Sequence, residues 1–352
     1  MNITKKIKII YEEAYAESIW CKHLLNGLVK EIKKRRILYE QVTDVHEISR
    51  DESVCIIGMN NYWIESVVEK CNAAGCIPLV LSNQSRRTAK GEYHRICPDI
   101  AGVAKGLSQA LKAAGRNRVA LYGANHAADL DRDRTEIFAK LIQDAADIYP
   151  NTGNLENCFQ SFFPKAALYD AVICVNGYAA ISLAKKLEKK NPELLKKLVI
   201  VSCEEILRHS KYNQWISLVE LNMESYGPAA LTALEMASSR SDISSITVKI
   251  KGDLCEIRKK DEADHYSAEE GHQLYEDPEI VSMTKIEQLL RDADDMDHHI
   301  IAMLLHNAKY SEIGDSCYMT EGNVKYRVKK YMSTCDCKTK KELLELLQEY
   351  LQ

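Results

Sequence analysis

Over its first 260 residues the chain alternates short runs of β-branched and apolar residues with segments of helical periodicity. One such segment carries Ile64, Val67, Val68 and Cys71 at the spacing of a single helix face. Strands that alternate with helices form parallel βαβ units, so this alternation predicts an α/β fold with helices on both faces of parallel sheets. The predicted strands span residues 7–11, 38–43, 54–59, 77–82, 118–123, 171–176, 198–202, 217–221 and 246–251.

The C-terminal part of the chain has a different character. Residues 261–297 contain thirteen acidic residues but only two basic ones, Lys285 and Arg291, which gives a net charge of -11. We interpret residues 261–295 as an acidic, solvated linker followed by a helix from about Ser282. Residues 296–352 hold four short helical patterns, with Thr320 as a candidate N-cap of the third. Such a set of short helices predicts a small all-α helix-turn-helix domain.

Composition and charge narrow the class of protein. Hydrophobic residues make up 46% of the chain and charged residues 28%, which is typical of a soluble globular protein. No apolar run is long enough to span a membrane or to form the core of a signal peptide, so we expect a cytoplasmic protein. The net charge of -4 hides a segment of net charge +4 at residues 309–341, which is the electrostatic pattern of phosphate binding.

Motifs for catalysis, metals and cofactors are missing from the sequence. The chain contains no P-loop, no nucleophile elbow, no His-Glu-x-x-His and no Gly-x-Gly-x-x-Gly motif. Its twelve cysteines include no Cys-x-x-Cys pair, and the adjacent His298 and His299 point to different sides of a helix. We therefore expect reduced, buried thiols, no metal site, no cofactor and no enzymatic activity.

Residues 310–328 read YSEIGDSCYMTEGNVKYRV, and they resemble the helix-turn-helix of LuxR/GerE-type regulators. The match places 312–314 on the scaffold helix and 320–325 at the start of the recognition helix, and it extends over about 296–350. Gly314 stands where that family has a small Ala, and Arg327 where it often has His. The resemblance implies base contacts from Asn323, Lys325, Tyr326 and Arg327 and phosphate contacts from Lys329 and Lys330. The alternative is a basic, solvated helix face.

Three segments of the first 260 residues resemble the ligand core of LacI-type regulators, which has the type I periplasmic-binding-protein fold. They are DAVICVN at 170–176, VIVSCEE at 199–205, and Arg134 placed four residues before Phe138. The resemblance implies two lobes that close over a ligand. Lobe one would comprise about 5–115 and 223–242, and lobe two about 118–221 and 243–260. The LacI family carries its DNA-binding helices at the N-terminus, whereas here the helix-turn-helix lies at the other end.

Candidate ligand contacts follow from this resemblance and from the predicted strand ends. Matching positions in the family imply Arg134, Asn176, Glu204 and Asn222, although Gly177 replaces a usual ligand-binding Asp. Loops at the carboxyl ends of predicted strands add polar and aromatic residues, since ligands of open α/β sheets bind there. These are Glu13, Tyr15, Asn60, Tyr62, Trp63 and Asn83. An arginine, several amides and aromatic rings are suited to a polyhydroxylated ligand such as a sugar or a nucleoside.

Together these patterns predict a ligand-responsive transcription regulator. Its expected partners are double-stranded DNA, a small-molecule effector and a second copy of the chain, because recognition of two half-sites requires two-fold symmetry. Two alternatives remain open. The chain could be a solute-binding protein for uptake, or a sensor whose C-terminal helical domain binds a protein.

Overall fold

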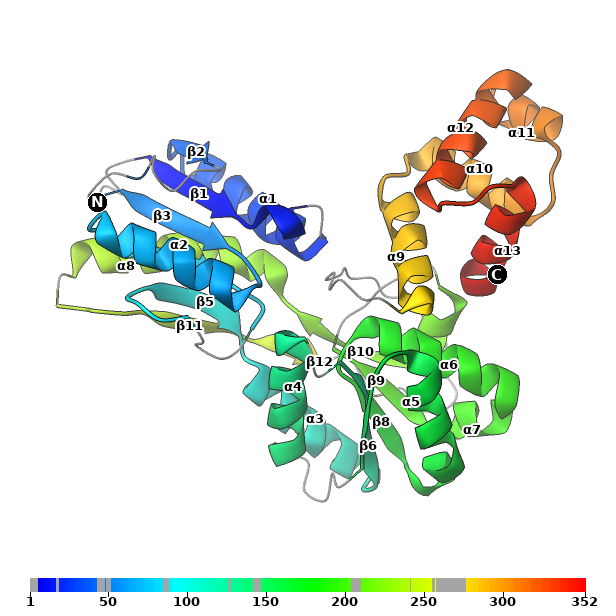
Figure 1. Ribbon diagram of the computed structural model, residues 1–352, viewed down its shortest axis with the longest axis horizontal. Helices are drawn as coiled ribbons and strands as arrows, with labels where there is room; N and C mark the ends of the chain where they lie inside the picture. The colour runs from blue at the N-terminus through cyan, green and yellow to red at the C-terminus, as the bar shows by residue number, and fades with distance from the viewer. Residues whose placement is uncertain are drawn as a thin grey trace.

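The computed structural model consists of two α/β lobes and a helical domain (Figure 1). In each lobe, helices cover both faces of a sheet in which most neighbouring strands are parallel, as the alternation of strands and helices predicts. The structure describes residues 6–16, 19–42, 48, 52–84, 89–125, 128–141, 147–203, 210–240, 242–254, 257 and 277–352.

Lobe one is built on a six-stranded sheet with the order β11-β5-β4-β3-β1-β2, in which every described pair is parallel. Helices α1 and α8 pack on one face and α2 on the other. The strands are β1 (Ile7–Tyr11), β2 (Tyr39–Gln41), β3 (Ser53–Ile57), β4 (Leu79–Leu81), β5 (His94–Pro98) and β11 (Thr247–Ile250). The helices are α1 (Ile19–Lys34), α2 (Asn61–Ala73) and α8 (Tyr226–Ser239), with the short η1 (Glu13–Tyr15) after β1.

Lobe two has a second six-stranded sheet, with the order β12-β10-β9-β8-β6-β7 and an antiparallel edge strand, β12. Helices α3 and α4 pack on one face, while α5 and α6 pack on the other. The strands are β6 (Val119–Ala124), β7 (Ile148–Pro150), β8 (Ala171–Cys174), β9 (Val199–Ser202), β10 (Ile216–Leu221) and β12 (Gly252–Leu254). The helices are α3 (Ile100–Ala113), α4 (Asp129–Leu141), α5 (Leu155–Phe162), α6 (Gly177–Lys190) and α7 (Pro192–Lys197), with η3 (Phe163–Leu168) and η4 (Lys211–Trp215).

Within the described ranges the chain crosses between the lobes three times: after β5, after β10 and between β11 and β12. As a result, two elements belong to a different lobe from the one that the sequence predicts. Helix α3, which falls inside the predicted 5–115 of lobe one, packs on the sheet of lobe two. Strand β11, inside the predicted 243–260 of lobe two, pairs with β5 of lobe one. Periodicity identifies an apolar face but not the sheet that it covers, which explains both differences.

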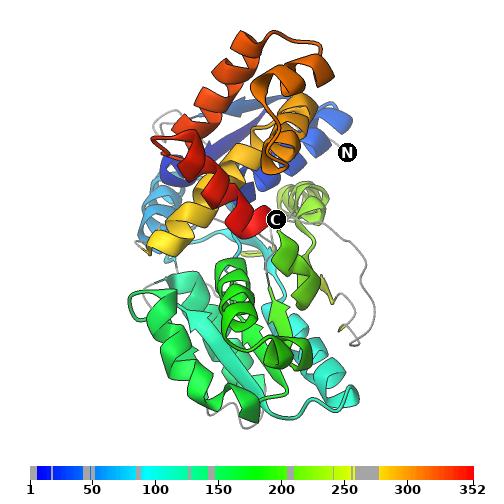
Figure 2. The ribbon, with the colours of Figure 1, turned by 90° about the vertical axis from the view of Figure 1, so that its right-hand side faces the viewer.

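The helical domain contains α9 (Pro278–Arg291), α10 (Asp295–Leu305), α11 (Tyr310–Ser316), α12 (Glu321–Thr334) and α13 (Lys340–Leu351). Helix α9 begins a turn earlier than expected because the Asp277 side chain caps it. The Thr320 hydroxyl caps α12 by accepting from the Asn323 amide at 3.3 Å, as its position in the sequence predicts. The predicted linker residues 261–276 lie outside the described residues. In both views α11 and α12 form the end of this domain far from lobe two (Figures 1 and 2).

None of the helices in the described part of the chain is both long enough and apolar enough to cross a lipid bilayer.

Candidate functional site

A cluster of buried polar side chains lies where the two lobes meet, and α4 stands at its centre. The first turn of α4 reaches lobe one, because Leu130 packs in the hydrophobic core of that lobe. One turn later, Arg134 is fully buried, and its Nη1 donates a hydrogen bond to the Val175 carbonyl at 2.9 Å. Val175 directly follows β8, so the sequence-predicted Arg134 lies at a strand end of lobe two.

Asn176 and Asp131 connect the ends of three elements in this cluster. The Asn176 side chain caps α6 by accepting from the Ala179 amide, and its Nδ2 donates to the Asp131 carboxylate at 2.9 Å. The same carboxylate oxygen accepts from the backbone amide of Asn125, which follows β6. The two predicted residues Arg134 and Asn176 are therefore both in contact with the segment that joins β8 to α6.

Lobe one contributes Arg95, Gln84 and Tyr226 to the cluster. Arg95 on β5 donates to the Gln84 carbonyl, and the Gln84 side chain donates to the Met59 carbonyl at 2.6 Å. Burial raises the pKa of Tyr226 well above its usual value, while the positive charges of Arg134 and Arg95 oppose that shift. Because Tyr226 lies on α8 of lobe one and Arg134 on α4 of lobe two, this interaction crosses the boundary between the lobes.

Several buried polar groups of lobe one have no hydrogen-bond partner within the described ranges, and two of them bear on a ligand site. They are the side-chain amide of Asn83, a residue that is 1% exposed, and the Tyr226 hydroxyl. A buried polar group without a partner destabilises the fold, so its presence requires an explanation. A polar ligand between the lobes would provide one. Since Arg134 is 0% exposed, the lobes must separate before a ligand can reach this cluster.

Two predicted residues of lobe one are exposed rather than buried. Glu13 is exposed on η1, whereas the neighbouring Glu12 is buried and its carboxylate accepts from the amides of Met59 and Asn60 at 2.9 and 3.0 Å. Asn60 caps α2 with its side chain and is itself exposed. Glu12 therefore ties the ends of β1 and β3 together, and Asn60 has a structural role as a helix cap.

The predicted aromatic residues also differ in their surroundings. Tyr62 is 86% exposed on α2. Trp63 packs so closely on Gly58 that a Cβ atom there would lie 2.6 Å from the indole ring. Tyr15 is half-buried and packs against the core of lobe one. Of these three aromatic residues, Trp63 and Tyr15 are used in packing within lobe one.

The last two predicted ligand residues are at the second crossing and beyond β9. Asn222 caps the short η5 (Met223–Ser225), where its side chain accepts from the Ser225 amide and hydroxyl. Glu204 lies outside the described residues. The cluster contains further polar residues that sequence reasoning missed: Asp131, Asp133, Gln84, Arg95 and Tyr226. Asp131 could have been found from the sequence, because it lies three residues before Arg134 and therefore on the same helix face.

In the helical domain a short turn joins α11 to α12, the two helices that cover the segment resembling a helix-turn-helix. The turn between them contains Tyr318 in the left-handed region at φ 53°, and it passes close to α11. A Cβ atom on Gly314 would lie only 2.7 Å from the Met319 carbonyl oxygen. Gly314 therefore permits α11 and the turn to approach more closely than an Ala would.

One face of α12 is exposed and basic. Val324 and Val328 are buried in the domain core, which leaves the polar side chains on the outside. The exposed predicted contacts are Asn323, Lys325, Tyr326, Lys329 and Lys330, and Tyr326 is 74% exposed. Lys325 also pairs with Glu321 one turn earlier, at 2.7 Å.

Arg327 differs from these residues because it is bound within the domain. Its Nη1 contacts the Asp294 carboxylate at 3.1 Å and the Asp297 carboxylate at 2.5 Å, and both acids lie at the start of α10. Burial acts to raise the pKa of Asp297, but hydrogen bonds from Tyr331 and Arg327 outweigh it and hold the pKa below its usual value. Arg327 thus fixes α12 on α10, so its guanidinium is engaged within the domain.

The described His, Cys, Asp and Glu side chains form neither a metal site nor a cluster of reactive thiols. Within the described ranges, no group of three or more His, Cys, Asp or Glu side chains could hold a metal ion. The described cysteines are free thiols, and all except Cys337 are buried. Burial raises the pKa of the Cys55 and Cys71 thiols to about 12, so these thiols stay protonated and unreactive at neutral pH.

Solved structures share the two-lobed fold. The glucose-galactose binding protein GanP from Geobacillus stearothermophilus has a TM-score of 0.55 and 11% sequence identity, and the match covers 72% of this chain and 97% of GanP. The transcriptional regulator CelR in complex with cellobiose has a TM-score of 0.55 and 11% identity, covering 72% of this chain and 85% of CelR. A PurR family transcriptional regulator from Vibrio parahaemolyticus has a TM-score of 0.55 and 12% identity, covering 74% of this chain and all of that one, 100%.

These neighbours establish the fold class. The two parallel-dominated sheets with helices on both faces form a type I periplasmic-binding-protein-like fold, as the sequence predicts. At such low identities the likeness concerns the fold alone. No protein-family model matches the sequence, and no curated protein sequence matches it significantly.

Proposed function

We propose that this protein is a ligand-responsive, DNA-binding transcription regulator. The observation that carries the proposal is the combination, in one chain, of a two-lobed binding-protein fold with an exposed basic helix at the position of a recognition helix. Regulators such as CelR and the PurR family protein share the first part. The second part supports DNA as the partner, since basic side chains on such a helix neutralise backbone phosphates.

The proposed effector is a small polar molecule such as a sugar or a nucleoside. Its site is the buried cluster between the lobes, with Arg134 and Asn176 on one side and Asn83 and Tyr226 on the other. The guanidinium can donate two parallel hydrogen bonds to hydroxyl or carboxylate oxygens, while the Asn83 amide offers a donor and an acceptor. GanP and CelR, which share the fold, bind sugars.

The proposed DNA-binding face comprises Asn323, Lys325 and Tyr326 toward the bases and Lys329 and Lys330 on phosphates. All five side chains are exposed on α12. The regulator would act as a homodimer, since two-fold symmetric proteins read two half-sites at a fixed spacing. The effector would shift DNA affinity by its differential affinity for the two lobe arrangements.

A thermal-shift screen of sugars, nucleosides and amino acids tests the effector site. A compound that binds only the folded protein raises the unfolding temperature by mass action. The shift caused by the best compound should disappear in Arg134→Ala. It should persist in Arg132→Ala, because Arg132 is exposed on the same helix. An unchanged shift in Arg134→Ala would mean that the ligand binds elsewhere.

A salt titration of binding to random-sequence duplex DNA tests the partner. The logarithm of the affinity should fall linearly with the logarithm of the salt concentration, with a slope of about -0.9 per neutralised phosphate. Replacing Lys329 and Lys330 by Ala should make the slope shallower by roughly two contacts. The matched control is the pair Lys196→Ala and Lys197→Ala on α7, where both lysines are also exposed. No binding at low salt would favour a protein partner for the helical domain instead.

A further inference from the structure

The helical domain and lobe two share one hydrophobic core. Buried residues of α6, such as Tyr178 and Ile181, belong to the same cluster as Ile280 and Met283 of α9 and Leu347 of α13. Helix α6 therefore packs on the sheet of lobe two on one side and on the helical domain on the other. A helix that is apolar on both sides is buried between two layers, and ten of the fourteen residues of α6 are indeed buried.

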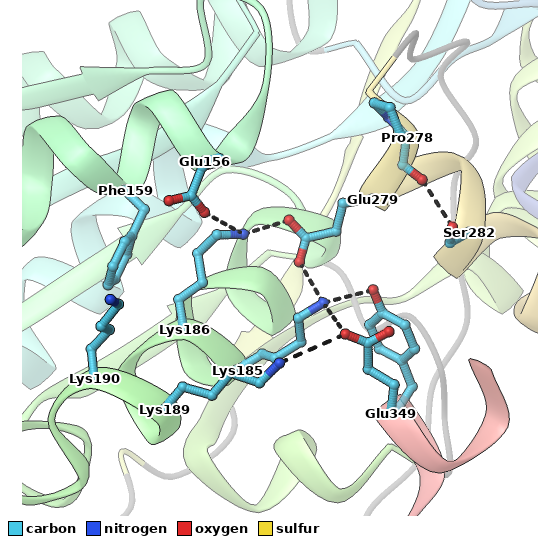
Figure 3. Close-up of a pocket in the computed structure, with 11 residues that line it drawn as sticks. Glu156, Phe159, Lys185, Lys186, Lys189, Lys190, Pro278, Glu279, Ser282 and Glu349 are labelled. Atoms are coloured by element: carbon cyan, nitrogen blue, oxygen red, sulfur yellow. Dashed lines mark hydrogen bonds and ion pairs between the residues drawn. The ribbon is translucent and has the colours of Figure 1, made fainter. Parts of the chain in front are cut away.

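Polar contacts add to this packing at the outer half of α6 (Figure 3). The Lys185 ammonium group lies 2.9 Å from the Glu279 carboxylate, 3.1 Å from that of Glu349 and 2.9 Å from the Tyr350 hydroxyl. Lys186 pairs with the other oxygen of Glu279. Since Glu279 lies on α9 and Tyr350 on α13, the two lysines of α6 hold both helices of the neighbouring domain.

Two further hydrogen bonds fix α9 on lobe two. The Asp277 carboxylate, which caps α9, also accepts from the Leu155 amide at the start of α5 at 2.7 Å. The Thr284 hydroxyl donates to the Tyr178 hydroxyl at 3.3 Å, in the first turn of α6. The contacts between α9 and lobe two therefore reach the start of α5 and extend along α6 from Tyr178 to Lys186.

The inner end of α6 belongs to the buried cluster between the lobes. Arg134 binds the Val175 carbonyl and Asp131 binds the Asn176 amide, so both contact the segment that enters α6. The first turn of α6 is also in tight contact with the sheet. A Cβ atom on Gly123 of β6 would lie 2.2 Å from the Cβ of Ala179. The start of α6 cannot shift without disturbing these contacts.

We propose that α6 mechanically couples the inter-lobe cluster to the helical domain. The coupling rests on the proposed function, because that function assigns a ligand to one end of α6 and DNA to the domain at the other. Helix α6 has 14 residues and therefore spans about 21 Å at roughly 1.5 Å per residue. Close-packed helices transmit displacement as rigid bodies rather than absorb it.

The exchange of one hydrogen bond suggests how a ligand would act on α6. In the present state Arg134 donates to the Val175 carbonyl. A ligand oxygen that accepts from the same nitrogen competes with that carbonyl and releases one restraint on the start of α6. The helix and the domain held by Lys185 and Lys186 then move together, which changes the position of α12.

Hydrogen–deuterium exchange on the full chain tests this coupling without ligand or DNA. Asn176→Ala removes the cap and the Asp131 contact at the inner end of α6. We expect the amides of α9 and α13 to exchange at least about fivefold faster in this variant than in the wild type. About fivefold is the lower end of the coupling usually measured between two sites. The exchange rates of the α2 amides in lobe one should not change. The matched control is Asn191→Ala, which removes the asparagine side chain that caps α7, directly after the outer end of α6. It should leave α9 and α13 as protected as in the wild type.

The reciprocal variant provides a second measurement, since coupling between two sites is mutual. Lys185→Met breaks the contacts at the outer end, and its readout is the Asn125 amide, which donates to the Asp131 carboxylate in the cluster. Faster exchange of this amide supports the coupling. Unchanged exchange there, or unchanged α9 and α13 in a folded Asn176→Ala protein, would overturn it. Because neither readout involves DNA or an effector, a failure of the proposed function leaves both results interpretable.

Discussion

Replacing Lys185 by Met should destabilise the packing of the helical domain on lobe two. The substitution keeps most of the apolar stem but removes the charge that contacts Glu279, Glu349 and Tyr350. The Tyr350 hydroxyl, on a residue that is 1% exposed, then loses its donor. Breaking a buried ion pair by removing one partner typically costs about 3–5 kcal/mol. Since Glu279 keeps Lys186 and Glu349 is partly exposed, we expect about 3 kcal/mol, near the lower limit.

Urea unfolding followed by tryptophan fluorescence and circular dichroism at pH 7 measures this change. Burial acts to lower the pKa of Lys185, but Tyr350 and Glu279 outweigh it and raise the pKa above its usual value. A raised pKa means that the charged lysine stabilises the fold fully below the unfolded value of about 10.4, so at pH 7 the whole contribution is present. The control is Lys196→Met, whose partner Glu193 is exposed, and it should leave the midpoint unchanged.

A double-mutant cycle with Tyr350→Phe identifies the physical cause. In Lys185→Met the stranded hydroxyl contributes part of the cost, and Tyr350→Phe removes that hydroxyl. The double variant should therefore be more stable than the sum of the two single effects predicts. Additive effects, or a change in Lys185→Met no larger than in Lys196→Met, would refute the assignment of Lys185 as the residue that holds the two parts together.

Three further variants test other parts of the structure. Gly123→Ala should cost about 2–5 kcal/mol in urea unfolding, because φ is +80° and the new Cβ would collide with Ala179. Asp297→Asn should flatten the acid limb of the stability curve. The lowered pKa of Asp297 gives a contribution that is present above about pH 4 and lost as the pH falls through the folded value, so the difference from wild type should shrink in acid. Asn83→Leu should raise the unfolding temperature of the free protein by removing a buried, unpartnered amide, yet abolish the shift caused by the best effector; a retained shift would place the ligand elsewhere.

The sequence predicts those strands that are buried on both faces of a sheet, because such strands consist of β-branched and other apolar residues. Strand β1 runs over Ile7–Tyr11, as its apolar run predicts. Strand β5 was missed because its sequence begins with His94 and Arg95 and ends with proline. Both polar side chains are buried for tertiary reasons: His94 accepts from the Ile246 amide, and Arg95 bonds within the inter-lobe cluster. Such polar partners lie far away in the sequence, so local periodicity cannot reveal them.

The candidate site was predictable only in part, for a similar reason. Family resemblance pointed to Arg134 and Asn176, and the structure brings both to the buried cluster at the strand ends of lobe two. In lobe one, the choice between Glu12 and Glu13 depends on the orientation of a single turn after β1. The structure turns Glu12 inward toward the amides of Met59 and Asn60, between β3 and α2, and Glu13 outward. A shift of one residue in such a turn cannot be decided from residue types.

Lobe two and the helical domain share one core, so they should unfold together. The domain boundary predicted from the sequence near residue 260 therefore does not separate two units of cooperative unfolding. A shortened chain ending at residue 260 would lack α9 and α13 and leave the outer face of α6 without its cover. That face would then expose apolar surface, and Lys185 would have lost its partners on α9 and α13. We therefore expect the shortened chain to aggregate rather than to form a soluble sensor domain. In calorimetry of the whole chain, lobe two and the helical domain should melt as one unit, and lobe one is the part able to melt separately.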